Sequence, residues 1–305
     1  MVRLRRKQGS GALLMRAGGE SILTMALERS MQDCDSEDFH VDLAGGRVFV
    51  RRWRPETLTD QAPIVLLHDS LGCVATWRDF PGQLARRLQR PVFAYDRLGF
   101  GQSSERHSPP SLDFIDDEAR TVFPALCRSL GLKRVVPFGH SVGGGMAIAI
   151  ASLNSQTGLC ASVVTESAQA FVESRTIEGV LAARRLFGDP GQLAKLARFH
   201  GSRARWVLDA WTGTWLDPEF SNWSLDVHLE HVQCPVLAIH GDKDEYGSCA
   251  FPTRIAQGVA GYAEAVILEG FGHVPHRENP ERVSAAVSEF LAKVEWHGPG
   301  FGGQL

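Results

Sequence analysis

The stretch VVPFGHSVGGGMAIAIA, Val135 to Ala151, determines how the rest of the chain is interpreted. An apolar run ends at His140 and Ser141, and glycines lie on both sides of this pair. Residues 139–143 fit the pattern G-x-S-x-G, which holds a nucleophilic serine when it follows a strand and precedes a helix. The serine then lies on a strained turn, and small residues two positions away on each side let the backbone bend. We therefore expect Ser141 to be a nucleophile.

The surrounding sequence predicts a mostly parallel sheet. Continuous apolar runs are typical of strands that are covered on both faces, and segments of helical length lie between most of them, which indicates right-handed crossovers. The expected strands are Pro63–Asp69, Pro91–Asp96, Lys133–His140, Cys160–Glu166, Pro235–Asp242 and Ala263–Gly270. The expected helices are Thr76–Gln89, Asp113–Leu130, Val142–Leu153, Pro252–Val259 and Asn279–Val294. A β-hairpin over Phe39–Trp53 precedes them.

One interval interrupts the alternation of strands and helices. About sixty residues between Glu166 and Pro235 contain no strand pattern and carry four tryptophans. We expect this interval to be a helical cap, inserted at about residues 168–232 of an α/β domain that spans 39–294. We expect residues 1–38 to form a disordered arm, because chain ends are often loose, and residues 295–305 to form a flexible tail.

The composition restricts the class of protein. The chain has 32 lysines and arginines against 35 aspartates and glutamates, so a nucleic-acid binder is not indicated. Six cysteines without C-x-x-C spacing indicate neither a zinc site nor a disulfide framework, and they favour a reducing, cytoplasmic location. No apolar run has the roughly 18 residues that a membrane span needs.

A serine hydroxyl needs a base, and the base needs a carboxylate to orient it. After an elbow of this kind the chain order is serine, acid, histidine. Two segments follow strands at the expected sites, HGDKDEYG (240–247) and GFGHVPHRENP (270–280). Asp242, Asp244 and Glu166 are candidates for the acid, since all three follow or end a predicted strand.

These motifs resemble those of the α/β-hydrolase superfamily, specifically its cofactor-free members with a helical cap, over about Phe39 to Val294. The family's G-x-x-D pattern matches Gly241 to Asp244, so the resemblance implies Asp244 as the acid. Its G-H-x-x-H-x-E-x-P signature matches Gly272 to Pro280 at each fixed position, so the resemblance implies His273 as the base. No cofactor and no metal are implied.

The oxyanion hole of such a site needs two N–H donors, and the resemblance implies Val142 and Ser70. Family members usually carry His-Gly before the second donor, whereas this chain has His68-Asp69. An aspartate carboxylate there would oppose catalysis unless it were turned away or hydrogen-bonded. His140 is not expected to be the base, because successive residues of a strand face opposite sides, and it is interpreted as a packing or pocket-wall residue.

The predicted cap indicates an apolar substrate. Trp206, Trp211 and Trp215 are candidates for a substrate-binding wall, because ligand pockets are largely aromatic and aliphatic. The segment Arg184–Arg205 carries six basic residues against Asp189. It is either a site for an anionic group, such as an acyl carrier, or a solvated helix face. His228 and His231 are three residues apart, but with no third ligand evident a metal site is not expected.

The favoured function is hydrolysis of a small or medium carboxylic ester through an acyl-enzyme. Two alternatives use the same triad: a thioesterase, and a hydrolase of carbon–carbon bonds in aromatic ring-cleavage products. A non-catalytic ligand receptor on the same fold is the alternative outside enzymes, since the fold alone does not determine the function.

Overall fold

The computed structural model describes residues 34–296. The expected arm and tail therefore lie largely outside the described residues. At both borders the prediction was wrong by a few residues: β1 (Asp35–Leu43) takes up 35–38, and α12 (Pro280–Trp296) takes up 295–296. The segment 35–38 contains three acids, which hid a strand that pairs with the arginine-rich end of its neighbour.

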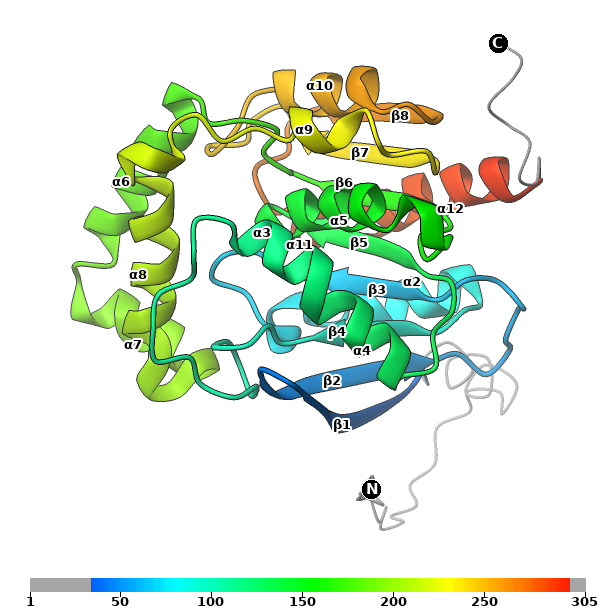
Figure 1. Ribbon diagram of the computed structural model, residues 1–305, viewed down its shortest axis with the longest axis horizontal. Coiled ribbons are helices and arrows are strands. Elements are labelled where there is room, and N and C mark those ends of the chain that lie inside the picture. The colour runs from blue at the N-terminus through cyan, green and yellow to red at the C-terminus, as the bar shows by residue number, and fades with distance from the viewer. Residues whose placement is uncertain (1–33, 297–305) are drawn as a thin grey trace, which may run out of the picture.

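Eight strands form one sheet in the order β1-β2-β4-β3-β5-β6-β7-β8 (Figure 1). β1 and β2 are an antiparallel hairpin, β2 is antiparallel to β4, and the other neighbours are parallel. The mostly parallel α/β fold predicted from the apolar runs is thus confirmed. The strands after β1 are β2 (Gly46–Arg54), β3 (Ile64–Leu67), β4 (Val92–Tyr95), β5 (Val136–His140), β6 (Val163–Glu166), β7 (Val236–Gly241) and β8 (Ala263–Leu268).

The helices agree with the predicted segments, with two differences. The expected helix 76–89 begins only at Phe80, because residues 74–77 form a short 3-10 turn. The expected helix 113–130 consists of α3 (Phe114–Asp117), a π-helical turn η2 (Glu118–Val122) and α4 (Phe123–Ser129). The other helices of the α/β domain are α2 (Phe80–Leu88), α5 (Val142–Leu153), α9 (Asp226–Leu229), α10 (Ala250–Gly258), α11 (Pro275–Glu278) and α12. Short 3-10 turns lie at Val74–Trp77 (η1) and Ser155–Thr157 (η3).

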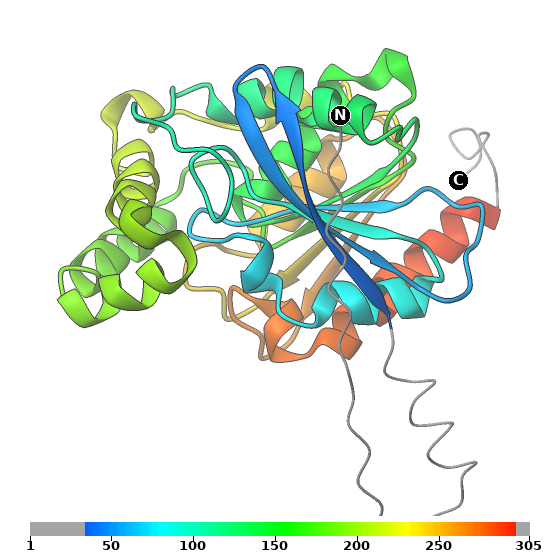
Figure 2. The ribbon, with the colours of Figure 1, turned by 90° about the horizontal axis from the view of Figure 1, so that it is seen from below.

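Helices cover both faces of the sheet, and each face has its own core (Figures 1 and 2). One core joins α4, α5 and α10 to the sheet through residues such as Phe123, Met146 and Phe251. The other joins α2 and α12 to the opposite face through residues such as Leu84 and Phe290. Burial on both faces explains why the central strands are apolar without alternation.

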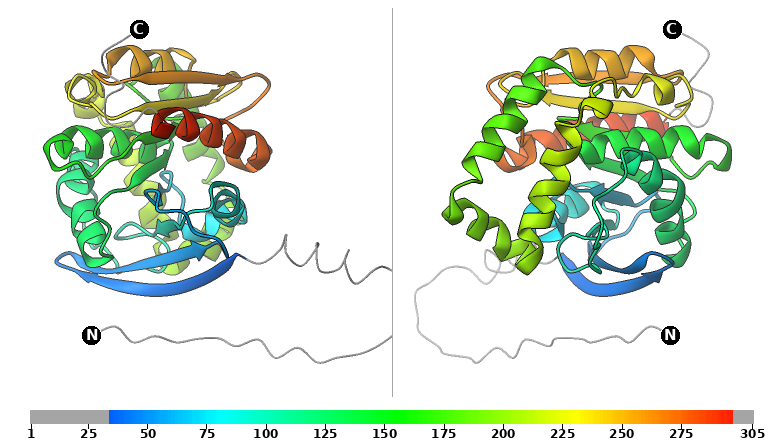
Figure 3. Two further views of the ribbon diagram at one scale, coloured as in Figure 1. Left: turned by 90° about the vertical axis from the view of Figure 1, so that its right-hand side faces the viewer. Right: turned by 60° about the vertical axis from the view of Figure 1, so that its left-hand side comes forward.

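The segment between β6 and β7 contains a helical insertion before α9. It contains α6 (Ser174–Leu186), α7 (Pro190–His200), α8 (Ala204–Trp215) and the short turns η4 (Gly201–Arg203) and η5 (Pro218–Phe220). α6, α7 and α8 stand together at one end of the sheet, on the left of Figure 1 and in front in the right panel of Figure 3. They are held by a small apolar cluster that includes Phe100, Leu196 and Val207. The insertion therefore covers the sheet edge where the loops after β3, β5 and β7 emerge.

Candidate active site

Ser141 lies on a sharp turn between β5 and α5. Its backbone angles are φ 57° and ψ −126°, a conformation that is costly for a residue with a Cβ. The neighbouring glycines make the turn possible: a Cβ on Gly139 would lie 1.9 Å from the carbonyl oxygen of Gly143, and one on Gly143 would lie 2.2 Å from that of Leu67. The sequence thus has glycine at 139 and 143 because no larger side chain fits.

The N-terminus of α5 begins directly after the serine. Val142 is the first residue of this twelve-residue helix, so its N–H has no partner within the helix. The aligned peptide dipoles also place partial positive charge at this end. The turn therefore presents a hydroxyl and a backbone donor side by side.

His273 and Asp244 form a hydrogen-bonded pair. Nδ1 of His273 lies 2.9 Å from Oδ1 and 2.8 Å from Oδ2 of Asp244, and the carboxylate is fully buried. Burial alone would raise the pKa of Asp244, but the hydrogen bond and charge of His273 outweigh it, so the pKa is lowered. The N–H of Tyr246 also donates to this carboxylate, at 2.7 Å. Nδ1 of His273 is thus bound to the carboxylate, and Nε2 is the ring nitrogen that remains for proton transfer.

The other two acid candidates have different partners. Asp242 accepts the N–H of Gly270 at 2.6 Å and lies 3.1 Å from Nζ of Lys243. Glu166 is fully buried, and its two oxygens accept from the N–H and Nδ1 of His276, both at 2.6 Å. Of the three carboxylates considered from the sequence, Asp244 is the one that contacts His273.

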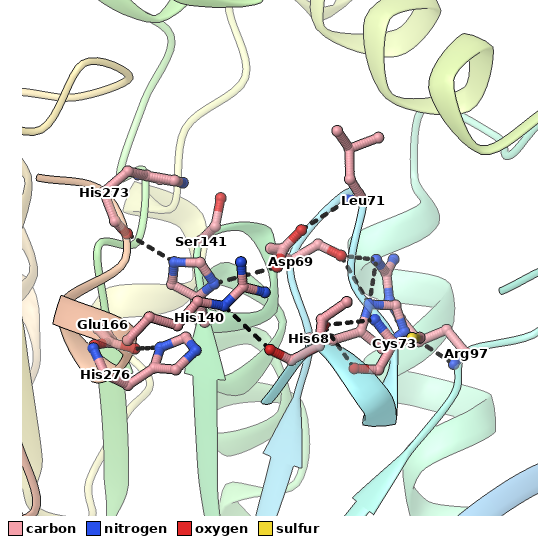
Figure 4. Close-up of polar contacts among 12 residues, drawn as sticks. His68, Asp69, Leu71, Cys73, Arg97, His140, Ser141, Glu166, His273 and His276 are labelled. Atoms are coloured by element: carbon pink, nitrogen blue, oxygen red, sulfur yellow. Dashed lines mark hydrogen bonds and ion pairs between the residues drawn. The ribbon is translucent and has the colours of Figure 1, made fainter. Parts of the chain in front are cut away.

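A cavity of about 340 Å³ lies between the sheet edge and the cap, and Ser141 and His273 both line it. Figure 4 shows a ring nitrogen of His273 pointing toward the Ser141 hydroxyl. The hydroxyl lies 3.5 Å from Oε1 of Gln169, a buried side chain after β6 that also lines the cavity. The cavity wall includes Leu71, Val180, Phe187, Leu196, Phe199, Trp211, Trp215, Tyr246 and Val274.

The three candidate tryptophans have different positions. Trp211 and Trp215 line the cavity, and the Trp211 ring lies 5.7 Å from that of Tyr246. Trp206 does not line it. Its ring packs against Phe100 at 5.7 Å, above Gly99, and borders a smaller cavity of about 40 Å³. The helical period places Trp206 on another side of α8 from Trp211, which the count of tryptophans alone did not reveal.

Ser70 lies at the loop after β3, where the second oxyanion donor is expected. The carbonyl of Asp69 accepts from Nη2 of Arg97 at 2.9 Å and lies 2.7 Å from Nδ1 of His68. Nε2 of His68 accepts the N–H of Arg97 at 3.1 Å, so Nδ1 is the donor to Asp69. In a trans peptide the next N–H points opposite to the carbonyl. The N–H of Ser70 is therefore directed away from Arg97, and Ser70 lines the cavity.

Asp69 itself is hydrogen-bonded. Its Oδ1 accepts the N–H of Leu71 at 2.7 Å, and its Oδ2 lies 3.4 Å from Nδ1 of His140. Burial would raise the pKa of Asp69, but these contacts hold it well below its usual range. The carboxylate in the oxyanion loop is thus engaged with its own loop and with His140.

The acid and histidine cluster below the serine also has ligand atoms for a metal. His140, Glu166 and His276 offer such atoms within 4.8 Å of one another. Nδ1 of His276 and both oxygens of Glu166 are already hydrogen-bonded to each other's residue, and all three residues are buried. These bonds already occupy Nδ1 of His276 and both oxygens of Glu166, so we interpret Glu166 and His276 as a hydrogen-bonded pair. His228 instead contacts Asp116 at 2.8 Å.

Two of the six basic residues in the basic segment of the cap have partners elsewhere. Arg203 donates to the carbonyls of Gly101 and Ser103, and Arg205 pairs with Asp209 on the same helix. Lys195 is the basic residue of this segment that lines the cavity, and Arg277 lines it from α11.

Comparison with known proteins identifies the family. The model of the alpha/beta hydrolase family matches residues 64–286. The chain belongs to the alpha/beta hydrolase family. The match extends over the elbow, the loop of Asp244 and the histidine segment, so the family resemblance inferred from these motifs is confirmed.

Individual relatives are more distant. The 1-acylglycerol-3-phosphate O-acyltransferase ABHD5 of Sus scrofa is 33% identical over 92 residues, which cover 30% of this chain and 26% of that protein. The match thus spans about a quarter of the relative's length. The proline iminopeptidase of Mycobacterium smegmatis has a TM-score of 0.64 at 21% identity, covering 86% of this chain and 99% of that one. Carboxylesterase CesB of Bacillus subtilis has a TM-score of 0.62 at 21% identity, covering 88% and 97%. These structures share the fold.

Sequence reasoning missed several residues near the serine. Gln169, Tyr246 and His240 surround Ser141, His273 and Asp244, and His240 lies 3.5 Å from the Asp244 carboxylate. Their common signal was their position just after or at the end of a strand, where open α/β sheets bind ligands.

Among residues 34–296, no helix has both the length and the apolar character that crossing a membrane requires.

Proposed function

We propose that this protein is a serine hydrolase that cleaves carboxylic esters through an acyl-enzyme on Ser141. The observation that carries the proposal is the buried Asp244 carboxylate on Nδ1 of His273, beside a cavity that Ser141 also lines. An imidazole held in this way has its Nε2 available to accept a proton. Family membership and the strained serine turn support the same function.

In the first half-reaction, Oγ of Ser141 would attack the ester carbonyl while Nε2 of His273 takes the hydroxyl proton. The carbonyl oxygen would become an oxyanion and accept from the N–H groups of Ser70 and Val142. Collapse of this intermediate breaks the bond to the alcohol, which leaves with the proton from His273. In the second half-reaction, water repeats these steps and releases the acid. Asp244 would stabilise the imidazolium in both halves and stay ionised.

The cavity favours a small or medium acyl group. Its volume of about 340 Å³ is at the lower end of ligand pockets, and most of its wall is apolar. Trp211 and Trp215 come from the cap, so the cap would set the space for the acyl or alcohol part. The Gln169 side chain lies 3.5 Å from the serine hydroxyl and would orient the ester.

An anionic substrate is the second candidate, and the charges of the cavity favour it. Lys195 and Arg277 line the cavity, whereas the acid among its described lining residues, Asp69, is engaged with Leu71 and His140. An acyl-coenzyme A thioester or a dienoate ring-cleavage product carries a matching negative charge. An acyl carrier would be bound by the same two cationic residues.

A substrate panel tests these functions. It contains p-nitrophenyl esters from acetate to decanoate, acyl-coenzyme A thioesters and dienoate ring-cleavage products, each with wild-type protein and with Ser141→Ala. We expect fastest turnover with short or medium p-nitrophenyl esters and background turnover with Ser141→Ala. If the wild-type protein prefers thioesters or dienoates, the second candidate, an anionic substrate, takes the place of the simple ester. Binding of these compounds without turnover by either protein would instead indicate a ligand receptor.

A further inference from the structure

Asp69 and His140 link three loops of the site. We propose that this positioning pair holds two loops in place relative to Ser141. One is the loop of Asp69 and Ser70 after β3, the oxyanion loop, and the other is the loop of His273 after β8, the base loop. The inference rests on the proposed function of Ser141. Neither residue would touch the reacting atoms, so both are positioning residues.

His140 connects the two loops through its two ring nitrogens. Nδ1 lies 3.4 Å from Oδ2 of Asp69, and Nε2 lies 2.8 Å from the carbonyl oxygen of His273 (Figure 4). The side chain is 1% exposed, and it precedes Ser141 directly in the chain. The buried ring of His140 thus contacts Asp69, which precedes Ser70, and the backbone of the proposed base His273. The same residue directly precedes the nucleophile turn.

The surroundings of His140 favour the protonated ring. Both of its nitrogens face acceptors, a carboxylate and a carbonyl, and an imidazolium can donate to both. The Glu166 carboxylate, itself bound to His276, adds a further negative charge. Burial opposes protonation, but the two carboxylates and the His273 carbonyl outweigh it, so the pKa of His140 is raised. The surroundings of this ring therefore favour protonation more than water does.

Asp69 transmits this contact to the oxyanion loop. Its carboxylate faces His140 with one oxygen and holds the N–H of Leu71 with the other, and its carbonyl is fixed by Arg97 and His68. The N–H of Ser70 between these two anchored groups cannot turn freely. A glycine at position 69 would keep the carbonyl contacts but lose both carboxylate contacts.

Loss of the pair should affect the rate of catalysis more than folding. Donors must lie within about 3 Å of the developing oxyanion, and misplacement by about 1 Å can cost about 100-fold in rate. Loss of the pair would let the Ser70 and His273 loops shift independently. Transition-state stabilisation should fall, while ground-state binding in the apolar cavity should change little.

A double-mutant cycle tests the pair. The variants are Asp69→Asn, His140→Gln and their combination, with Asp69→Gly as the residue usual in the family. The matched control is another contact between a partly exposed aspartate and a buried histidine, Asp116 with His228, changed to Asp116→Asn, His228→Gln and both. Each protein is assayed for kcat, KM and thermal midpoint with the best p-nitrophenyl ester. The rate at which a fluorophosphonate labels Ser141 is followed by intact mass, which needs no knowledge of the substrate.

We expect each site variant to lower kcat and the labelling rate by about 10- to 100-fold, with KM within about threefold. The double variant should have a kcat and a labelling rate no lower than those of the less active single variant, because the two residues act as a unit. The control variants should alter the thermal midpoint and leave kcat and labelling within about twofold.

Two outcomes separate the failures. If the wild-type serine is not labelled and no ester is turned over, the proposed function is wrong. If the wild type is labelled but Asp69→Asn and His140→Gln are labelled equally fast, or if their effects on kcat multiply, the positioning pair is wrong. Should His140→Gln not fold, the kcat and labelling rate of Asp69→Asn and Asp69→Gly decide, since these changes concern a partly exposed residue of the loop after β3 and leave the histidine in place.

Discussion

Both carboxylate oxygens of Asp244 lie within 2.9 Å of Nδ1 of His273, although 29 residues separate the two in the chain. The pair joins the loop after β7 to the loop after β8, two strands that lie side by side in the sheet. Replacing Asp244 by asparagine keeps the size of the side chain but favours the wrong imidazole tautomer. We therefore expect kcat to fall by about 10⁴ with the fold intact, measured by ester hydrolysis and circular dichroism.

Asp242→Asn is the control for this change. Asp242 bonds to the N–H of Gly270 and does not touch His273, so its replacement should cost far less activity. A nearly active Asp244→Asn protein alongside an inactive Glu166→Gln protein would move the acid to the end of β6.

Ser141 and His273 should behave as one unit. We expect Ser141→Ala and His273→Ala each to lower kcat by several orders of magnitude, and the double variant to be little worse than either, because neither residue activates the reaction without the other. Steady-state hydrolysis of the best panel ester measures this. Full activity in His273→Ala with none in His140→Gln would assign the base to His140.

The glycines of the elbow should be irreplaceable. A Cβ at Gly143 would lie 2.2 Å from the carbonyl oxygen of Leu67, which is backbone and cannot move aside. We expect Gly143→Ala to lower the thermal midpoint sharply or to prevent soluble expression. Gly213→Ala is the control, because that position in α8 has no atom within 4 Å, and alanine there should stabilise the protein by about 0.5 to 1 kcal/mol. Equal midpoints for the two variants would show that the turn is not constrained.

Much of the fold and the centre of the site could be predicted from sequence, for a physical reason. The six predicted strands are continuous apolar runs, and all but β8 are buried. The serine, acid and histidine stand in short motifs whose glycines and turns are local requirements. Contacts between distant residues were not visible. Asp69 and His140 are 71 positions apart, and nothing local signals that their side chains meet. The position of Trp206 likewise depended on how α8 is rotated against the sheet.

The two tryptophans of α8 should therefore have different roles. Trp211 lines the cavity, so Trp211→Ala should enlarge it and move the preferred p-nitrophenyl ester toward longer acyl chains. Trp206 packs on Phe100 outside the cavity, so Trp206→Ala should lower the thermal midpoint without changing the chain-length profile. Profiles from acetate to decanoate for both variants measure this. A shift in the Trp206 variant alone would mean that substrate enters the smaller cavity.

The buried His140 should make stability depend on pH. Its folded-state pKa is raised above 6.5 because the carboxylates of Asp69 and Glu166 and the His273 carbonyl outweigh burial. A raised pKa stabilises the folded protein by an amount that is fully present below pH 6.5 and is lost as the pH rises through the folded-state pKa. The buried rings of His68, His200, His240 and His276 have lowered pKa values and act in the opposite direction. The charge of His140 helps to lower the pKa of His276, so His140→Gln also alters the titration of His276.

The free energy of unfolding of wild type minus that of His140→Gln gives the contribution of His140 together with its effects on Asp69, Glu166 and His276. Urea unfolding from about pH 6 to about pH 9 should give a difference that is largest at the acid end and declines as the pH rises. Asp69→Asn removes one of the carboxylates that raises this pKa, so its difference from wild type should decline in the same direction. A difference that stays constant over this range for both variants would show that His140 does not titrate there, and the raised pKa of His140 beside Asp69 and Glu166 would be wrong.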